Sequence, residues 1–229
     1  MNFDKFEEKA GVVFKDKSLL KQAFTHRSYI NENRDTKPEH NERLEFLGDT
    51  VLQSAVTDYV FHNFPEMNEG RLSWLRSALV NANTCSAIAE ELNVKKFLLV
   101  SKGAMKESPR AQQSILADAL EAIIGAIYID QNYETAKNFI LTHVIPLTKD
   151  ILEKGVWFDA KSLFQENAQA NEGITPAYKL ISESGPPHDS TFVMGVYLKD
   201  ELIGRGSGKS KQEAEQEAAR AALESKGWK

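Results

Sequence analysis

Apolar side chains recur at the spacing of α-helices through the first two thirds of the chain. Ser18 begins a short amphipathic run, and a longer run from about Glu39 to Phe64 places leucine, valine and alanine at steps of three and four residues. Pro65 ends that run, because proline lacks the amide hydrogen that a helix interior needs. Asn68 is the predicted N-cap of a further helix, which continues to about Ile88.

Three later segments complete an all-helical part of the chain. Residues 93–110 contain a glycine, a proline and several charges, so we expect mainly a loop there. Ser114–Asp130 is apolar on most sides and predicts a buried helix. Tyr133–Leu152 predicts a last helix, with a kink at Pro146.

The pattern changes after residue 157. We expect a helix, then three runs of β-forming residues, then an alanine-rich helix, with turns at Gly185-Pro186-Pro187 and at Asp200. The expected ranges are Asp159–Ala170, Ala177–Ser182, Ser190–Leu198, Glu201–Arg205 and Lys209–Leu223. The sequence therefore predicts a multidomain fold, with an all-α domain at 1–151, a linker at 152–157 and an α+β domain of α-β-β-β-α order at 158–229.

Composition narrows the possible functions. Hydrophobic residues make up 41% of the chain and charged residues 27%, which is typical of a folded globular protein. The 28 Lys and Arg against 33 Asp and Glu give a formal charge of −5, shared between both predicted domains. This charge excludes a protein that coats nucleic acid by bulk attraction, so any contact with RNA must be local.

Cysteine content and apolar stretches bear on the cellular setting. The single cysteine, Cys85, excludes an intramolecular disulfide and a cysteine-based zinc site, and it fits a reducing, cytoplasmic setting. The charged N-terminus has no signal-peptide pattern. The longest apolar stretch, Ile115–Ile129, is too short to span a bilayer and contains Asp118 and Glu121. We therefore expect a cytoplasmic protein with no membrane partner.

Two groups of acidic residues lie on the predicted apolar helices. Glu42, Glu45 and Asp49 have i, i+3, i+7 spacing and share one helix face, while Asp118 and Glu121 share a face of the predicted buried helix. A carboxylate on a buried helix is costly unless it pairs with a cation or holds a metal ion. These acids are therefore candidates for a metal site.

The surroundings of the two groups favour this interpretation. Gly48 lies beside the first group and would let another backbone approach closely. No Lys or Arg lies between Arg110 and Lys137 to neutralise the second group. The pattern predicts a site for a hard divalent cation, Mg²⁺ with Mn²⁺ as a substitute, because such cations prefer oxygen ligands and serve phosphoryl chemistry.

The same acids are compatible with roles other than Mg²⁺ binding. They could be exposed, or they could pair with Arg43, Arg71 and Arg76. A di-iron carboxylate site is excluded because the chain has no Glu-x-x-His motif. An all-α nucleotide pyrophosphohydrolase, which also uses acid pairs with Mg²⁺, stays open on the first domain alone.

The second predicted domain has a local pattern typical of RNA binding. Lys209 and Lys211 follow a Gly-Ser-Gly segment at the start of the last helix, where the helix dipole attracts phosphate. Gln165 and Glu166 on the first helix and His188 on the Gly-Pro-Pro loop are suited to contact 2′-hydroxyls in the minor groove of duplex RNA. The lysines alone would fit a solvated helix start, but the α-β-β-β-α order around them favours double-stranded RNA as a partner.

Taken together, these motifs resemble the ribonuclease III family. The resemblance to its two catalytic segments lies in HNERLEFLGD at 40–49 and SILADALEAIIGAIYID at 114–130. Further similar blocks are THRSY at 25–29, EGRLSWLRSALV at 69–80 and LLVSKGA at 98–104. Residues 159–224 resemble the double-stranded RNA-binding domain, with GPPHDSTF at 185–192 and GKSKQEAEQEAARAAL at 208–223.

The resemblance implies an enzyme and a set of site residues. The family is a homodimeric, Mg²⁺-dependent endonuclease that hydrolyses both strands of RNA duplexes, such as rRNA and mRNA precursors, and leaves 5′-phosphate and 3′-hydroxyl ends. On matching positions, Glu45, Asp49, Asp118 and Glu121 are the implied metal ligands. Asp49 and Glu121 are also the implied catalytic residues.

Four further positions follow from the resemblance alone. Glu42 and Glu69 match additional acids of the cleavage valley, and His26 matches a position that we expect to be structural. Phe46 matches an aromatic residue that docks into the partner subunit, although an ordinary core phenylalanine fits the same pattern. Two rival functions remain: a catalytically silent duplex-RNA binder, which the four intact acids oppose, and a pyrophosphohydrolase, which the C-terminal domain opposes.

Overall fold

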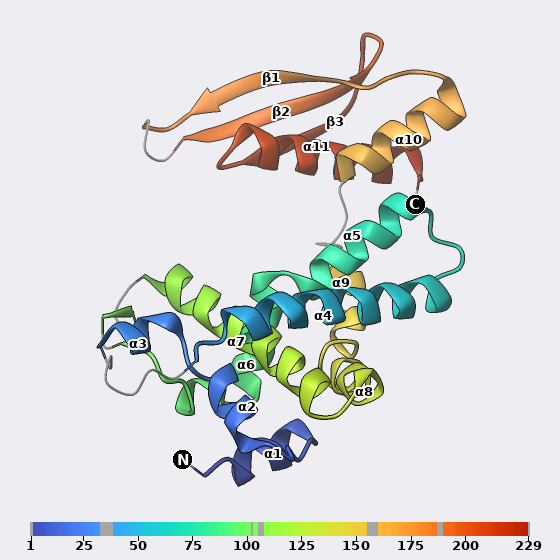
Figure 1. The fold of residues 1–229 in the computed structure, drawn as a ribbon. Helices are drawn as coiled ribbons and strands as arrows, with labels where there is room; N and C mark the ends of the chain where they lie inside the picture. The colour runs from blue at the N-terminus through green and yellow to red at the C-terminus, as the bar shows by residue number, and fades with distance from the viewer. Residues whose placement is uncertain are drawn as a thin grey trace. The chain divides into compact units, whose positions relative to one another are not determined.

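The computed structural model describes residues 2–32, 39–101, 103–104, 108–154, 160–186 and 190–228. Its elements in chain order are α1 (Asp4–Ala10), α2 (Lys17–Ala23), α3 (Arg27–Glu32), α4 (Glu42–Asn63), α5 (Glu69–Val80), α6 (Ala82–Glu91), the 3₁₀ helix η1 (Val94–Lys96), α7 (Pro109–Asp130), α8 (Tyr133–His143), α9 (Leu147–Lys154), α10 (Ala160–Glu172), β1 (Ala177–Ser184), β2 (Thr191–Leu198), β3 (Glu201–Gly208) and α11 (Lys211–Lys226) (Figure 1). Two compact units divide the chain, residues 1–157 and 158–229. The predicted fold class, a helical domain followed by an α-β-β-β-α domain, is confirmed.

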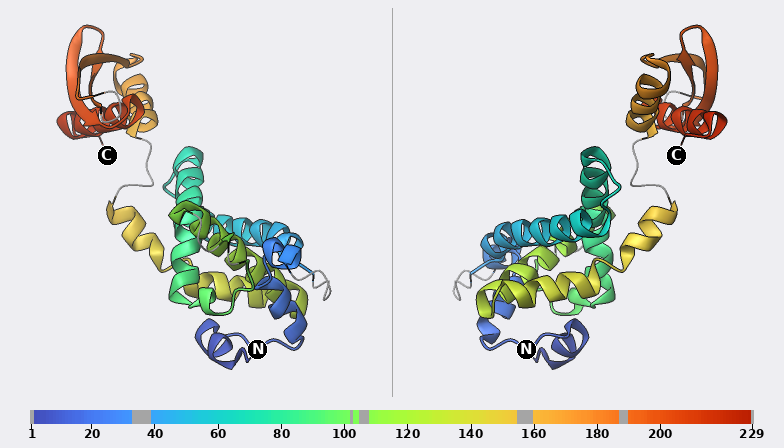
Figure 2. Two further views of the ribbon diagram at one scale, coloured as in Figure 1. Left: turned by 90° about the vertical axis from the view of Figure 1, so that its left-hand side faces the viewer. Right: turned by 90° about the vertical axis from the view of Figure 1, so that its right-hand side faces the viewer.

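α7 is the central helix of the first unit. It packs against α2, α4, α6 and α8, so neighbours cover most of its circumference. In both views of Figure 2, α4 and α7 lie side by side. Ile123, Ile124 and Ile127 are fully buried. This burial is what an apolar pattern on most sides of a helix predicts, and it makes α7 the scaffold on which the acids of the site are fixed.

The start of α7 differs from the prediction. The helix begins at Pro109, five residues before the predicted Ser114, within a stretch that we expected to be a loop. The Ser108 side chain accepts a hydrogen bond from the backbone N–H of Ala111 and caps the helix. Proline is favoured in the first turn, where its missing N–H has no helical partner in any case. Ser-Pro is thus a start signal here.

The predicted helix from Asn68 to Ile88 is two helices. Asn68 caps α5 as expected and accepts a hydrogen bond from the backbone N–H of Arg71 at 2.9 Å. Asn81 has an extended backbone, with φ −73° and ψ 163°, which ends α5. Its side chain accepts from the backbone N–H of Thr84 at 2.9 Å and begins α6. The apolar period continues across this break, so the period alone did not reveal it.

The last helices of the first unit are also separate. α8 ends at His143 and α9 begins at Leu147, so Pro146 lies between two helices instead of kinking one. α9 extends to Lys154, three residues into the predicted linker, and residues 155–159 lie outside the described ranges. The limits of the linker stay a prediction. Within the described ranges, no helix has both the length and the apolar character needed to cross a bilayer.

The second unit is an antiparallel sheet of strand order β1-β2-β3 with α10 and α11 on one face (Figure 1). Val196, Leu198 and Phe164 contribute to its buried core. Gly206 lets α11 approach β3, since a Cβ built there would lie 2.1 Å from the backbone nitrogen of Ala218. The first and third strands reach Ser184 and Gly208, a few residues beyond their predicted ends.

Candidate active site

The two predicted acidic groups meet where α4 crosses α7. A Cβ built on Gly48 of α4 would lie 1.7 Å from the carbonyl oxygen of Glu121. Gly125 of α7 approaches α4 in the same way, since a Cβ there would lie 2.2 Å from the carbonyl oxygen of Leu44. The close approach predicted at Gly48 is confirmed, and it brings the acidic faces of both helices together.

Glu45, Asp118 and Glu121 form a three-carboxylate cluster. One oxygen from each residue lies within 4.8 Å of the others, and all three side chains are partly buried. Among the ion pairs of the described residues, none joins these three acids to Lys or Arg. Pairing with arginines therefore does not account for the cluster.

Burial and mutual repulsion raise the pKa values in the cluster. Burial, followed by the charges of Asp118, Glu42 and Asp49, raises the pKa of Glu45 to about 6. Burial, followed by the charges of Asp49, Asp118 and Glu45, raises the pKa of Glu121 to about 8. Like charges are thus held together at a cost, which a bound cation would offset.

Asp118 and Cys85 complete the set of side chains near this crossing that could bind a metal ion. Burial raises the pKa of Asp118, and a hydrogen bond from Ser114 opposes that shift. Burial, with a contribution from the charge of Glu121, raises the pKa of the Cys85 thiol to about 12. The thiol donates to the carbonyl of Val80 at 3.6 Å. Because this thiol stays protonated, the described cluster offers carboxylate oxygens only, which fit a hard cation such as Mg²⁺ or Mn²⁺ better than zinc.

Asp49 lies beside the cluster but is not one of its three members. Nε2 of Gln53, one turn further along α4, donates to both carboxylate oxygens of Asp49 at 2.9 Å each. The charge of Asp49 nevertheless contributes to the raised pKa of Glu121. The structure therefore brings three of the four predicted ligands into one cluster and holds the fourth at its side. Gln53 was not predicted, although its i, i+4 spacing from Asp49 was visible.

The two predicted accessory acids have different surroundings. Glu42, at the start of α4, accepts a hydrogen bond from Nη1 of Arg27 at 3.2 Å. Its charge reaches the cluster, because it contributes to the raised pKa of Glu45. Glu69, at the start of α5, is exposed and accepts from Oγ of Ser73 at 2.9 Å. Glu69 is not among the three clustered carboxylates.

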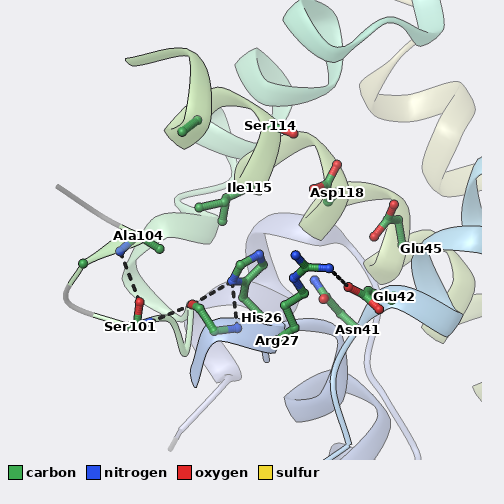
Figure 3. Close-up of a pocket in the computed structure, with 13 residues that line it drawn as sticks. His26, Arg27, Asn41, Glu42, Glu45, Ser101, Ala104, Ser114, Ile115 and Asp118 are labelled. Atoms are coloured by element: carbon green, nitrogen blue, oxygen red, sulfur yellow. Dashed lines mark hydrogen bonds and ion pairs between the residues drawn. The ribbon is translucent and has the colours of Figure 1, made fainter. Parts of the chain in front are cut away.

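A pocket of about 790 Å³ opens beside the cluster. In Figure 3, Glu45 and Asp118 lie toward one end of its lining and Ser101 toward the other. Nδ1 of His26 lies 2.8 Å from Oγ of Ser28, which accepts the backbone N–H of Ser101 at 3.0 Å. His26 thus connects the start of α3 to the segment that precedes α7. The lining combines hydroxyl and amide side chains with the carboxylates of Glu42, Glu45 and Asp118 and the guanidinium of Arg27, so the pocket is polar and leads to the acids.

The predicted RNA-binding residues of the second unit lie on two helices. Gln165 and Glu166 are exposed on α10 and line a pocket of about 500 Å³. Lys209 and Lys211 are exposed at the start of α11. His188 lies outside the described residues.

The start of α11 carries an anionic side chain of its own. The helix begins at Lys211, because Ser210 is its N-cap and accepts the backbone N–H of Glu213 at 3.1 Å. Oε2 of Glu213 in turn accepts the backbone N–H of Lys209 at 2.7 Å. The helix N-terminus that we expected to face phosphate is therefore partly occupied by its own carboxylate. The Ser-x-x-Glu spacing of a capping box was visible in the sequence.

Phe46 points away from the core of its own chain. Its exposed fraction is 79%, so the alternative of an ordinary core phenylalanine is wrong. A pocket of about 610 Å³ lies beside it, lined in part by Leu19, Leu47 and Ile129. Ile129 is also exposed, at 51%. An exposed aromatic ring and a pocket with both apolar and charged lining residues are thus adjacent on one surface.

Comparisons with known proteins cover both units. A family model described as ribonuclease-III-like matches residues 16–147, and one described as double-stranded RNA binding motif matches residues 160–226. Ribonuclease 3 of Protochlamydia amoebophila is 45% identical over 95% of this chain and 89% of its own length. Ribonuclease 3 of Enterococcus faecalis is 43% identical over 96% of this chain and 95% of its own length.

A solved structure agrees with these matches. The nuclease domain of ribonuclease III from Campylobacter jejuni is 44% identical, with a TM-score of 0.57 over 63% of this chain and 97% of that one. That domain is described as flexible in a region involved in dimer formation. The chain therefore belongs to the ribonuclease III family of endoribonucleases that act on double-stranded RNA, as shown by the two family models and by the sequence similarity over nearly the whole chain, with which the acidic cluster agrees.

Proposed function

We propose that Glu45, Asp49, Asp118 and Glu121 bind Mg²⁺, for which Mn²⁺ can substitute, and that the chain hydrolyses RNA duplexes to 5′-phosphate and 3′-hydroxyl ends. The observation that carries this proposal is the three-carboxylate cluster, whose oxygens lie within 4.8 Å of one another. When bound, a divalent cation lowers the pKa of water and offsets the charge that develops on the leaving oxygen. Bacterial rRNA and mRNA precursors in the cytoplasm are the proposed substrates.

The chain's own residues supply the remaining parts of the reaction. Glu121, whose pKa is raised to about 8 in the structure, loses its proton when a cation offsets the nearby charges. Asp49 and Glu121 are the proposed catalytic residues, as the family resemblance implies. Arg27 and the hydroxyl groups that line the adjacent pocket would contact the RNA backbone beside the acids, and Glu42, which accepts a hydrogen bond from Arg27, is a proposed accessory acid. The role of Glu69 as an accessory acid stays a prediction.

Binding of the duplex is assigned to the second unit. Gln165, Glu166 and His188 are proposed to contact 2′-hydroxyls in the minor groove. Lys209 and Lys211 are proposed to contact phosphates, and their exposure at the start of α11 supports this role. Such contacts read duplex shape and carry little sequence information.

Two chains are proposed to assemble through Phe46. The exposed ring and the pocket beside it support an interface in which the ring of one chain packs against the apolar residues of this pocket in the other. The description of the Campylobacter jejuni nuclease domain, which refers to dimer formation, agrees with this assembly.

A cleavage assay with labelled duplex RNA, in Mg²⁺ or in EDTA, tests the proposed function. We expect cleavage only with the metal, and no hydrolysis of a nucleoside triphosphate in parallel. Glu121→Gln should abolish cleavage and leave duplex binding largely intact, since binding is assigned to the second unit. Metal-independent cleavage, or near-normal cleavage by Glu121→Gln, would contradict the proposal.

A further inference from the structure

Gln53 and Asp49 lie one turn apart on α4, at the edge of the three-carboxylate cluster. Nε2 of Gln53 lies 2.9 Å from each of the two carboxylate oxygens of Asp49. Among the described residues, Gln53 is the one whose side chain donates a hydrogen bond to the Asp49 carboxylate. Gln53 is thus a neutral donor to Asp49, an acid that lies outside the three-carboxylate cluster.

The charges around Asp49 give this contact its significance. Glu45 and Glu121 lie close enough for the Asp49 charge to act on both of them. A hydrogen bond from an amide stabilises the anion, whereas the neighbouring carboxylates repel it. Without the amide, Asp49 would be free to turn away from the cluster toward solvent.

We propose that Gln53 is a positioning residue for Asp49, whose carboxylate it holds at the edge of the cluster. Because a single nitrogen contacts both oxygens, Asp49 can turn one oxygen to an arriving cation and keep the other on the amide. The inference rests on the proposed metal-dependent function of the cluster. Partners that hydrogen-bond to metal ligands orient them, and their loss lowers metal affinity by about 10–100-fold.

If Gln53 only stabilised α4, its removal would lower the stability of the metal-free fold and leave cation affinity unchanged. Gln53 is exposed, and an exposed i, i+4 pair adds little to the stability of a helix. Removing the amide should therefore leave the metal-free fold unchanged and affect cation binding alone. Asn63 provides a control on the exposed surface of the same helix. Its Nδ2 donates to the carbonyl of Tyr59, one turn earlier in α4, at 2.9 Å, and this hydrogen bond does not involve an acid of the cluster.

The experiment compares the full-length wild type with Gln53→Met, Gln53→Glu and Asn63→Ala. Mn²⁺ binding is measured by calorimetry, and thermal unfolding is followed across a Mg²⁺ titration that starts in EDTA. Gln53→Met, which keeps the shape but cannot donate, should melt as wild type in EDTA and bind Mn²⁺ about 10-fold more weakly. Gln53→Glu should bind still more weakly, because it adds a like charge one turn from Asp49. Asn63→Ala should bind as wild type.

Duplex cleavage by the same proteins gives a second measurement. The Mg²⁺ concentration for half-maximal cleavage should rise in Gln53→Met, with a smaller change in kcat at saturating Mg²⁺. Equal Mn²⁺ affinity in Gln53→Met and wild type would overturn the inference, and so would an equal loss in Asn63→Ala. A wild type that binds neither cation would overturn the proposed function itself, which is a separate result from equal binding by wild type and variant.

Discussion

Gly48 and Glu121 face each other across the crossing of α4 and α7, so closely that a Cβ on Gly48 would lie 1.7 Å from the carbonyl oxygen of Glu121. No carbon and oxygen atoms that are not bonded approach to that distance, so any side chain at position 48 must push the helices apart. Glu45 and Asp49 flank Gly48 in the sequence, and Glu121 itself carries an acid of the cluster. The contact that packs the helices therefore also sets the spacing of the carboxylates.

Gly48→Ala should damage both the fold and the cation site. Overpacking of this kind typically costs about 1–3 kcal/mol, and a contact with rigid backbone lies at the upper end. Urea denaturation should show the loss, and the stabilisation by Mg²⁺ should shrink with it. Gly103→Ala is the control, because the nearest described atom to a Cβ there is Oγ of Ser101 at 3.9 Å. Equal stability of the two variants would show that the helix crossing adjusts without cost.

The stability of the metal-free protein should depend on pH through Glu121. Its carboxyl has an ordinary pKa of 4.5, which burial and then the charge of Asp49 raise to about 8 in the fold. Between these values the native state keeps a proton that the unfolded chain has lost, so the free energy of unfolding falls as pH rises and then levels off above about 8. Urea denaturation in EDTA across this range measures the slope.

Glu121→Gln isolates this contribution from those of other groups. The amide does not titrate, so the free energy of unfolding of the variant should fall less steeply than that of the wild type over the same pH range. Mg²⁺ binding to the wild type should strengthen with rising pH, since the cation must displace the proton. Parallel pH profiles for wild type and variant would contradict the raised pKa.

Asp118→Asn tests the repulsion within the cluster. Two like charges about 4 Å apart repel by about 4 kcal/mol at an effective dielectric constant near 20. Mg²⁺ at about 100 times its dissociation constant adds roughly 2.7 kcal/mol of stability. The variant should therefore melt at a higher temperature than wild type in EDTA but gain less from Mg²⁺. A variant that melts lower in EDTA and gains as much would make Asp118 a structural hydrogen-bonding residue instead of a ligand.

The acids of the cluster could be predicted because their positions repeat with the helical period. Glu45, Asp118 and Glu121 lie on faces set by spacing alone, and Gly48 marked where another backbone would approach. Pairing of the two faces required only that α4 and α7 be neighbours. The contacts of side chains one turn apart, such as Gln53 with Asp49, were visible as spacing, but their rotamers depend on the packed structure.

The helix breaks were harder to predict than the helices. Asn81 ends α5 and caps α6 within an apolar period that continues across both helices, so periodicity favoured one long helix. Ser108 and Pro109 begin α7, although both residues also suit a loop. In each case a single side chain that accepts a backbone N–H decides the boundary, and its effect depends on local backbone geometry.

Phe46→Glu should shift the protein from dimer to monomer. The exposed ring lies beside a pocket lined in part by Leu19, Leu47 and Ile129, and a carboxylate at the same position would have to be desolvated to pack against these residues in a partner. Analytical ultracentrifugation measures the shift, with Phe61→Glu as a control because Phe61 is also exposed, at 63%, but lies at the other end of α4. A Phe46→Glu protein that sediments as a dimer at wild-type concentrations would remove Phe46 from the interface.

Substitutions of opposite charge test the proposed phosphate contact at the start of α11. Lys209→Ala with Lys211→Ala should weaken duplex binding and reduce its salt dependence, because fewer counterions are released. Glu213→Gln should do the opposite, since Oε2 of Glu213 accepts the backbone N–H of Lys209 and places a negative charge where phosphate should approach. Removal of that charge should tighten binding and steepen the salt dependence, while the amide oxygen can still accept the backbone hydrogen bond.

Glu224→Gln makes the same charge change in the last turn of α11, at the opposite end of the helix from Lys209 and Lys211, and serves as the control. Duplex affinity measured at several salt concentrations, with two duplexes of unrelated sequence, gives each slope. Both duplexes should respond alike, because phosphate contacts are independent of sequence. If Glu213→Gln and Glu224→Gln tighten binding equally, the effect belongs to net charge alone, and the carboxylate at the helix start does not oppose the phosphate.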